Sequence, residues 1–309
     1  MKKHKLGSTG YEISSIGLGT VQFGVDYGYT QKKTQQEVNH ILQSAWECGI
    51  NMLDTASEYG DSEKKIGIFM AQNDAEFVIF TKLKKIDKET AQERRMLERA
   101  MNDSVEHSLE NLQVQTLDFL LLHQAETFLI ENSNLYECVH QLKKDGLIRG
   151  FGISVYEQAE VTAALEHGHE TIDFFQFPYN IFDQRFRPLS KELKKKNIGA
   201  ITRSAFLKGI IPSRIEDIPD ELEKLVPYKE QAQKVASQMG ITVAELALLF
   251  VTQNENLTSA ILGVDSAEEL KQNVDVINKY EKLELHEKQL DKLEVKDVNL
   301  IDPRKWKSF

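Results

Sequence analysis

Short apolar segments alternate with longer amphipathic segments along most of this chain. The apolar segments end at turn residues, as buried strands do, and the segments between them have helical spacing. Eight such strand–helix units predict a parallel sheet covered by helices. The expected strands span residues 16–20, 50–54, 76–82, 117–122, 147–153, 172–176, 198–203 and 258–262. The expected helices span residues 34–47, 62–70, 91–111, 132–145, 157–167, 188–196, 228–239, 242–253 and 266–280.

The length of the chain fits one closed barrel. Eight parallel strands with their helices need about 250 residues, and the chain has 309. We therefore expect an α/β fold, a (β/α)8 TIM barrel, as a single domain over residues 1–309. Residues 6–14 alternate around glycine turns and predict a short N-terminal β-hairpin. Residues 23–33 form a polar loop after the first strand, on the face that carries the carboxyl ends of the strands.

The C-terminal segment 281–309 lies outside the repeating pattern. It is charged at first and then carries the apolar residues Leu300, Ile301 and Trp306. Apolar side chains of this size need burial. We expect this tail to pack back on the barrel, either over the substrate pocket or against the outer helices.

Charge and cysteine content exclude several classes of protein. The formal net charge is -10 and the sequence pI is about 5.4, which argues against a nucleic-acid-binding surface. No apolar run approaches membrane-spanning length, and the basic N-terminus lacks an apolar signal core, so we expect a cytoplasmic protein without a membrane partner. Cys48 and Cys138 lie among apolar neighbours and should be reduced, structural thiols that form neither a disulfide nor a metal site.

Four chemically different side chains stand at or just beyond the ends of three expected strands. Asp54 ends the second strand and Tyr59 follows it in a loop. Lys82 ends the third strand, and His123 directly follows the fourth. Since the carboxyl ends of parallel strands converge on one face of a barrel, an acid, a phenol, an ammonium and an imidazole should meet there. This arrangement predicts a catalytic site.

These four residues, in this order, resemble the catalytic tetrad of the aldo-keto reductase family. The resemblance runs from about Leu6 to about Asn273. It implies an NAD(P)-dependent oxidoreductase that interconverts a carbonyl and an alcohol by hydride transfer. The substrate would be a small aldehyde, ketone or sugar-like molecule. The tail from Ile301 to Trp306 and the Arg203-Ser204 pair also resemble a bacterial branch of the family that is associated with carbohydrate metabolism.

The tetrad has a clear chemical logic. A free tyrosine, with a pKa of about 10, is a weak acid at neutral pH. An ammonium such as Lys82 favours the phenolate and lowers the pKa of Tyr59, and Asp54 holds the ammonium in place. His123 would orient the substrate carbonyl, stabilise developing charge and share in proton transfer. Tyr59 is then the general acid in reduction and the general base in oxidation.

The resemblance also implies an extended nicotinamide cofactor across the barrel mouth, and no Rossmann-type glycine fingerprint is evident. The residues that it places against the cofactor are Gly19, Thr20, Val21, Asp54, Ser154, Gln176, Arg203, Ser204, Phe206, Gly209, Gly263, Glu269, Gln272 and Asn273.

Two positions expected near the nicotinamide, Val155 and Arg203, depart from the family pattern. Ser154 matches the first residue of a Ser-Asn pair that holds the carboxamide, but Val155 replaces the Asn. Gln176 matches the carboxamide-binding Gln. Arg203 stands where the family usually has an aromatic that stacks on the nicotinamide. Its planar guanidinium can stack in the same way, hold an anionic group of the substrate, or lie at the surface.

The adenosine end of the cofactor bears on the choice between NAD and NADP. Gln272 and Asn273 match the positions that contact adenine. Where members selective for NADP carry a Lys and an Arg, this chain has Gly263 and Glu269. A carboxylate repels a 2′-phosphate and accepts hydrogen bonds from ribose hydroxyls, which favours NAD. Lys271 can still turn inward and favour NADP.

Two other classes of function stay open at this point. One is a cofactor-binding regulatory or interaction protein with slow or no turnover, which the loss of the Asn at Val155 permits. The other is a barrel lyase or isomerase without a nicotinamide, which would leave Gln176 and the Gln272-Asn273 pair unexplained. The sequence identifies neither the substrate nor the oligomeric state.

Overall fold

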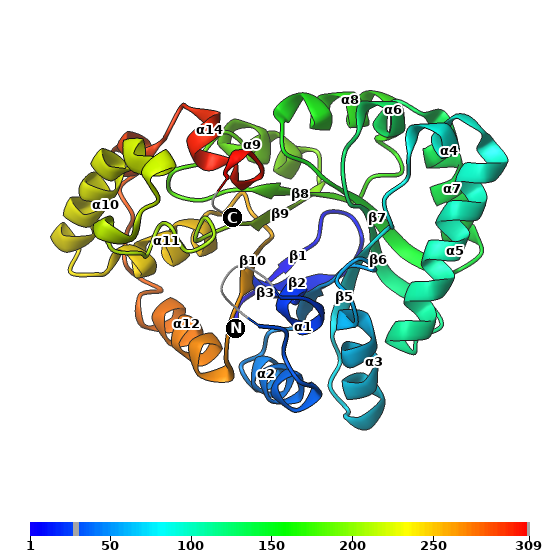
Figure 1. Cartoon of the computed structure of the whole chain (residues 1–309), viewed down its shortest axis with the longest axis horizontal. Helices are drawn as coiled ribbons and strands as arrows, with labels where there is room; N and C mark the ends of the chain where they lie inside the picture. Colours follow the sequence, from blue (N-terminus) through cyan, green and yellow to red (C-terminus); the bar gives the residue numbers. More distant parts are fainter. Residues whose placement is uncertain (27–30, 308–309) are drawn as a thin grey trace.

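Eight parallel strands close into a barrel in this computed structural model, which describes residues 1–26 and 31–307 (Figure 1). Each strand pairs with the next along the chain, and β10 closes the barrel against β3. The strands are β3 (Ile16–Gly19), β4 (Met52–Asp54), β5 (Val78–Lys82), β6 (Leu117–Leu122), β7 (Ile148–Ser154), β8 (Phe174–Pro178), β9 (Gly199–Arg203) and β10 (Ser259–Gly263). The predicted TIM barrel is confirmed.

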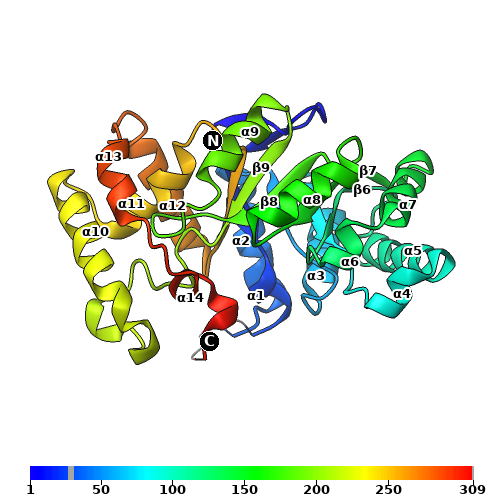
Figure 2. The same ribbon diagram turned by 90° about the horizontal axis from the view of Figure 1, so that it is seen from above.

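Helices surround this barrel on the outside (Figures 1 and 2). They are α1 (Val21–Gly24), α2 (Gln35–Glu47), α3 (Ser62–Gln72), α4 (Lys88–Gln92), α5 (Arg94–Leu112), α6 (Thr127–Ile130), α7 (Ser133–Lys144), α8 (Gln158–Gly168), α9 (Arg187–Lys195), α10 (Val226–Gln238), α11 (Val243–Thr252) and α12 (Ala267–Lys279). The expected single helix over 91–111 is wrong at its start. Glu93 is extended, with φ -102° and ψ 115°, and separates α4 from α5.

The polar loop expected over 23–33 begins differently in the structure. The short helix α1 occupies its start, and residues 27–30 of the loop lie outside the described residues. The predicted start of α2 is confirmed, because Thr34 caps it. The Thr34 hydroxyl accepts from the backbone N–H of Glu37, and the Glu37 carboxylate accepts from the N–H of Thr34 at 2.7 Å.

An N-terminal hairpin closes one end of the barrel. Strands β1 (Lys3–Lys5) and β2 (Glu12–Ser14) pair antiparallel, and Leu6, which follows β1, and Ile13, within β2, are fully buried. Gly199 makes room for this plug, since a Cβ there would lie 2.5 Å from Cδ1 of Leu6. The hairpin is confirmed, although its first strand starts at Lys3. It leaves the carboxyl ends of the strands as the face at which a ligand can enter.

The side chains inside the barrel form layers, and a polar layer lies next to that open face. One apolar cluster fills the barrel, and its members from the strands are Met52, Phe80, Phe119, Leu121, Phe174, Ile201 and Ile261. Because side chains alternate along a strand, residues two positions apart face the same side. Asp54, Lys82 and Gln176 each stand two residues after a member of this cluster. They therefore form the next layer inside the barrel, toward its mouth.

The C-terminal tail returns to the barrel, as expected. It contains α13 (Glu287–Leu290) and α14 (Val298–Ile301), and it crosses toward the loop after β8, where the N–H of Val295 donates to the carbonyl of Phe182 at 2.9 Å (Figure 2). Leu300, Ile301 and Trp306 are buried. The indole N–H of Trp306 donates to the carbonyl of Asn299 at 2.9 Å.

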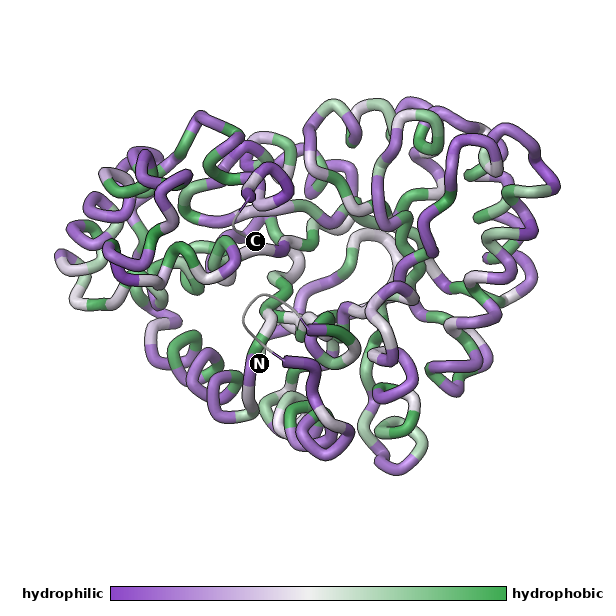
Figure 3. The backbone as a smooth tube through the Cα atoms, in the orientation of Figure 1, coloured by the Kyte–Doolittle hydropathy of each residue, from purple (hydrophilic) through white to green (hydrophobic). Residues whose placement is uncertain are grey.

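Hydrophilic and hydrophobic residues alternate along the outer helices, whereas several strands are largely hydrophobic (Figure 3). Within the described ranges no single helix is long and apolar enough to cross a membrane. The helical segments 220–238 and 243–252 are long and apolar enough only when they are taken together, and they meet at a bend of 83°. Both cysteines are free thiols.

Candidate active site

An ion pair lies at the centre of the barrel mouth. The ammonium of Lys82 donates to both carboxylate oxygens of Asp54, at 2.8 and 2.9 Å, and to the carbonyl of Thr55 at 2.8 Å. The side-chain amide of Gln176 donates to Oδ1 of Asp54 at 2.7 Å. Lys82 and Asp54 are buried, at 1% and 6% exposure. Although burial lowers the pKa of Lys82, the attraction of the Asp54 carboxylate outweighs it, so this pKa is raised and the lysine is charged.

The loop after β4 brings Tyr59 to this ion pair. Nζ of Lys82 lies 5.1 Å from the centre of the phenol ring. Two glycines allow the loop to approach α1 closely. A Cβ on Gly60, which has φ +55°, would lie 2.3 Å from the carbonyl oxygen of Gly24, and a Cβ on Gly24 would lie 1.6 Å from that of Tyr59. A larger residue at either place would therefore move Tyr59.

The pKa of Tyr59 does not follow the sequence-based expectation. Burial raises this pKa above its usual value of 10, while Lys82 and Arg203 lower it. The predicted influence of the ammonium is present, but the expected net decrease is wrong, because the loss of solvent around the phenol has the larger effect. Tyr59 is consequently a protonated phenol at neutral pH.

His123 lies beside Tyr59 and has a partner that sequence reasoning missed. The imidazole and phenol rings meet edge-on, with centres 5.9 Å apart. Nδ1 of His123 lies 2.9 Å from Oε2 of Glu58. Burial and Lys82 lower the pKa of His123, whereas Glu58 and Asp54 raise it, and the net shift is downward. The only sequence signal for Glu58 was its place next to Tyr59.

The barrel strands place the predicted carboxamide-binding residues together. Ser154 and Gln176 end neighbouring strands, pair in register, and are buried at 3% and 1% exposure. Val155, which replaces an Asn, is fully buried and presents its backbone instead of a polar side chain. Its carbonyl accepts from the guanidinium of Arg203 at 3.3 Å.

Arg203 belongs to a stack that joins the barrel mouth to the tail. Its guanidinium carbon lies 4.0 Å from the ring centre of Tyr156, and that of Arg304 lies 3.3 Å from the same centre. The buried carboxylate of Asp302 holds Arg304, with 2.6 Å between Oδ2 and Nη2. Sequence reasoning missed Tyr156 and Arg304, since no local pattern links a loop after β7 to the end of the chain. The tail thus reaches the mouth of the barrel.

The loop after β9 carries three predicted contact residues, Ser204, Phe206 and Gly209, and has an unusual conformation. Ser204, Leu207, Lys208 and Gly209 all have positive φ, at +65°, +48°, +51° and +85°. Phe206, between them, is half-buried against the core. Positive φ in non-glycine residues is unfavourable and persists where surrounding contacts enforce it.

The buried ammonium of Lys229 supplies such contacts. It donates to the carbonyls of Ile210 and Ser213, at 2.6 and 2.5 Å, and to the Ser213 hydroxyl at 2.9 Å. Asn180 donates to the carbonyl of Ser204 at 3.0 Å. The loop after β9 is therefore fastened on both sides of its strained segment.

The predicted adenosine end lies along the start of α12. Gly263 is exposed at the end of β10, and Gln272 is exposed on the helix. The carboxylate of Glu269 accepts from the N–H of Asp265 at 2.6 Å. Nδ2 of Asn273 is shielded from solvent and has no hydrogen-bond partner among the described residues. A buried donor without a partner fits a site at which a ligand supplies the acceptor, so these residues fit a dinucleotide.

Gly19, Thr20 and Val21, at and after the first barrel strand, were predicted to contact the cofactor, but the side chain of Thr20 is engaged within the protein. The hydroxyl of Thr20 is buried, donates to the carbonyl of Asp54 at 3.0 Å and accepts from Ser62 at 2.9 Å. Gly19 is buried in β3, and Val21 begins α1. The side chain of Thr20 therefore braces the barrel mouth instead of facing it.

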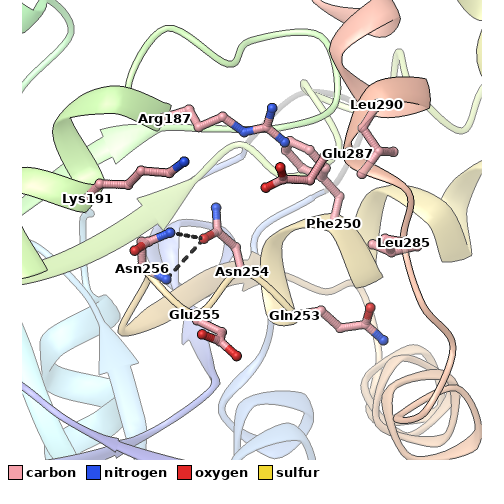
Figure 4. Close-up of a pocket in the computed structure, with 10 residues that line it drawn as sticks. All are labelled: Arg187, Lys191, Phe250, Gln253, Asn254, Glu255, Asn256, Leu285, Glu287 and Leu290. Carbon is pink, nitrogen blue, oxygen red and sulfur yellow. Dashed lines mark hydrogen bonds between the residues drawn. The ribbon is translucent and has the colours of Figure 1, made fainter.

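A separate pocket lies on the outer side of the barrel, between α9, α11 and the tail (Figure 4). Its volume is about 290 Å³, and its lining includes Arg187, Lys191, Phe250 and Asn254. It contains none of the tetrad. Across residues 1–26 and 31–307, no three His, Cys, Asp or Glu side chains are grouped as metal ligands.

A parallel barrel whose mouth holds an acid–ammonium pair, a phenol and an imidazole defines a class of barrel oxidoreductases. Residues 15–297 match the Aldo/keto reductase family. The chain belongs to this family of oxidoreductases, which uses NAD(P)H, and the resemblance seen in the sequence is confirmed.

Curated relatives share about a quarter of the sequence over nearly the whole chain. L-galactose dehydrogenase of Arabidopsis thaliana is 25% identical over 305 residues, which cover 94% of this chain and 92% of the relative. NADH-specific methylglyoxal reductase of Escherichia coli is 24% identical over 317 residues, with 90% and 94% covered. The holo form of aldo-keto reductase AKR11C1 from Bacillus halodurans has a TM-score of 0.78 at 21% identity, covers 99% of this chain and 100% of its own, and shows the same fold.

Proposed function

We propose that this protein interconverts a small carbonyl compound and the corresponding alcohol, with a nicotinamide cofactor bound across the barrel mouth. The observation that carries the proposal is the buried Lys82–Asp54 pair beside Tyr59, with His123 against the same phenol. A buried ion pair next to two groups that transfer protons is typical of an active site. The cofactor supplies or removes the hydride.

The four side chains divide the remaining work. Tyr59 exchanges a proton with the substrate oxygen through its hydroxyl. Lys82 stabilises negative charge that develops on the phenol, and Asp54 holds Lys82 in place. His123 orients the substrate oxygen when the imidazolium form donates a hydrogen bond to it. Because these groups are held inside the barrel mouth, little reorganisation accompanies the reaction.

The cofactor would lie from β7 to α12. Ser154 and the amide oxygen of Gln176 would bind its carboxamide, since the amide nitrogen of Gln176 already donates to Asp54. Arg203 would stack on the nicotinamide ring, with Tyr156 supporting the guanidinium. Gln272 and the unpartnered Nδ2 of Asn273 would contact adenine.

NAD is the cofactor that these residues favour. The carboxylate of Glu269 lies at the start of α12, where one oxygen accepts from a backbone N–H. Its charge would repel a 2′-phosphate, and it can accept from ribose hydroxyls. A relative is named as an NADH-specific methylglyoxal reductase, which supports this choice.

The substrate would be an aldehyde, ketone or sugar-like molecule. Arg203, Tyr156 and Arg304 give the mouth a polar wall on the side of the tail. Polar groups of this kind suit hydroxylated or anionic carbonyl compounds better than apolar ones. The name L-galactose dehydrogenase of one relative supports a sugar-like substrate.

Substitution of Tyr59 by Phe tests the assignment. Tyr59→Phe should bind the cofactor as the wild type does and lose turnover by at least about a hundredfold, since a positioned acid contributes 10²–10⁴ in rate. Tyr280→Phe, which removes a hydroxyl at the end of α12, is the matched control and should leave turnover unchanged. If Tyr59→Phe keeps most of its turnover, the assignment is wrong. Cofactor binding by the wild type with slow or no turnover would instead favour the regulatory function.

A further inference from the structure

A carboxylate holds one nitrogen of the His123 ring. Oε2 of Glu58 lies 2.9 Å from Nδ1 of His123, and the Glu58 side chain is 43% exposed while that of His123 is 23% exposed. An ionised carboxylate only accepts hydrogen bonds, so Nδ1 must carry the hydrogen. In a neutral ring Nε2 then has the lone pair. The contact therefore fixes the tautomer of the imidazole.

Other groups around His123 determine when the ring is charged. Lys82 and burial oppose the imidazolium, and Glu58 and Asp54 favour it. Tyr59, whose ring packs edge-on against His123, is itself a protonated phenol. A neutral His123 with hydrogen on Nδ1 can accept a proton at Nε2, but it can donate there only after it becomes an imidazolium.

On the basis of the function proposed above, we propose that Glu58 is a positioning residue. By accepting from Nδ1–H, Glu58 keeps Nε2 as the nitrogen that exchanges protons with Tyr59. Tyr59, His123 and Glu58 then form one relay between the substrate oxygen and solvent. The relay allows a phenol that stays protonated to serve as the acid, because each proton that it gives up is replaced from His123.

The relay balances in carbonyl reduction. The hydride brings its electron pair to the carbonyl carbon, the π pair of the C=O bond moves to oxygen, and that oxygen takes the proton of Tyr59. Tyr59 recovers a proton from Nε2 of the His123 imidazolium. The neutral imidazole keeps its Nδ1–H bond to Glu58 and takes up one proton from solvent. Alcohol oxidation follows the same path in reverse.

The Glu58→Gln variant, studied by 15N NMR of His123 and by pH–rate profiles, tests this proposal. In the wild type Nδ1 should carry the hydrogen of the neutral ring. Loss of the carboxylate should lower the pKa of His123 by about half a unit or more, because an ion pair with the imidazolium is removed. Glu126→Gln, in the exposed loop after β6, makes the same charge change without a bond to His123 and should leave this pKa in place.

The kinetic measurement separates a relay from a merely structural contact. For Glu58→Gln, the pH above which reduction slows should move downward by the same shift as the pKa of His123. The KM for the carbonyl should stay within about twofold, and kcat at acidic pH should match the wild type. A neutral wild-type ring with hydrogen on Nε2, an unchanged pKa of His123 in the variant, or an unmoved pH profile would each overturn the proposal.

The two proposals fail in different ways. If the wild type turns over no carbonyl or alcohol, the proposed function falls, and the relay that rests on it falls with it. The NMR spectra would still show whether Glu58 fixes the tautomer. If turnover is normal and Nε2 carries the hydrogen, only the role of Glu58 is wrong.

Discussion

The Lys82 ammonium and the Asp54 carboxylate form a two-point contact, at 2.8 and 2.9 Å, at the layer of the barrel just above its apolar interior. Their strands are neighbours, and each side chain stands two residues after a buried apolar one. The contact thus follows from strand register and period. Since both side chains are buried, neither charge has water to replace its partner.

Asp54→Asn should destabilise the protein by about 3 kcal/mol or more, because it leaves the Lys82 ammonium buried without a counter-charge. The double variant Asp54→Asn, Lys82→Met removes the uncompensated charge and should recover part of this loss. Urea unfolding followed by circular dichroism measures both. Asp103→Asn, which breaks the exposed pair with Arg99, is the control and should leave the midpoint unchanged. A double variant no more stable than Asp54→Asn would contradict this explanation.

Glu269→Gln should increase the affinity for NADPH severalfold and leave that for NADH nearly unchanged. Gln keeps an acceptor for the N–H of Asp265, so the start of α12 is preserved, while the charge that repels a 2′-phosphate is lost. Fluorescence titration of the variant with both cofactors measures the change. Glu268→Gln removes a charge one residue away, on an exposed position, and serves as the control. An equal gain in both variants would reflect net charge alone.

The free energy of unfolding should depend on Lys229 at alkaline pH. Burial lowers the pKa of Lys229 to about 8, whereas an unfolded lysine titrates near 10.5. Between these values the unfolded chain binds more protons, so stability rises with pH. From pH 8 to 9.5 this group raises the free energy of unfolding by about 1.5 kcal/mol.

Comparison with Lys229→Met isolates this contribution. Cys48 and Cys138, whose pKa values are raised by burial, make stability fall with pH in the same range, but they do so equally in both proteins. The free energy of unfolding of the wild type, measured relative to that of Lys229→Met, should therefore rise from pH 8 to 9.5. A difference independent of pH would mean that Lys229 keeps an ordinary pKa.

The parts of the site that follow from strand periodicity were predictable from the sequence. The alternation of apolar and amphipathic segments predicted the barrel, and the polar residues at strand ends predicted that Asp54 and Lys82 meet on one face of it. The capping residues Thr34 and Glu37 placed the start of α2 correctly. These features depend on local sequence and on rules of strand geometry that hold for every parallel barrel.

The contacts made by loops and the tail were not predictable in the same way. Glu58 reaches His123 from a loop, and Arg304 reaches Tyr156 from the end of the chain. Loop conformation depends on tertiary packing more than on local pattern. The pKa of Tyr59 was misjudged for a related reason. The motif shows which charged residues accompany Tyr59, but the burial of its phenol depends on the whole fold.

A fluorescence titration with NADH and NADPH, carried out in parallel on the wild-type protein, tests the central claim most directly. Binding of NADH with a micromolar Kd, and weaker binding of NADPH, is the predicted result, because in the proposed placement of the cofactor the carboxylate of Glu269 would repel a 2′-phosphate. Absence of binding for both cofactors at millimolar concentration would contradict the proposed hydride transfer, whatever the geometry of Asp54, Tyr59, Lys82 and His123.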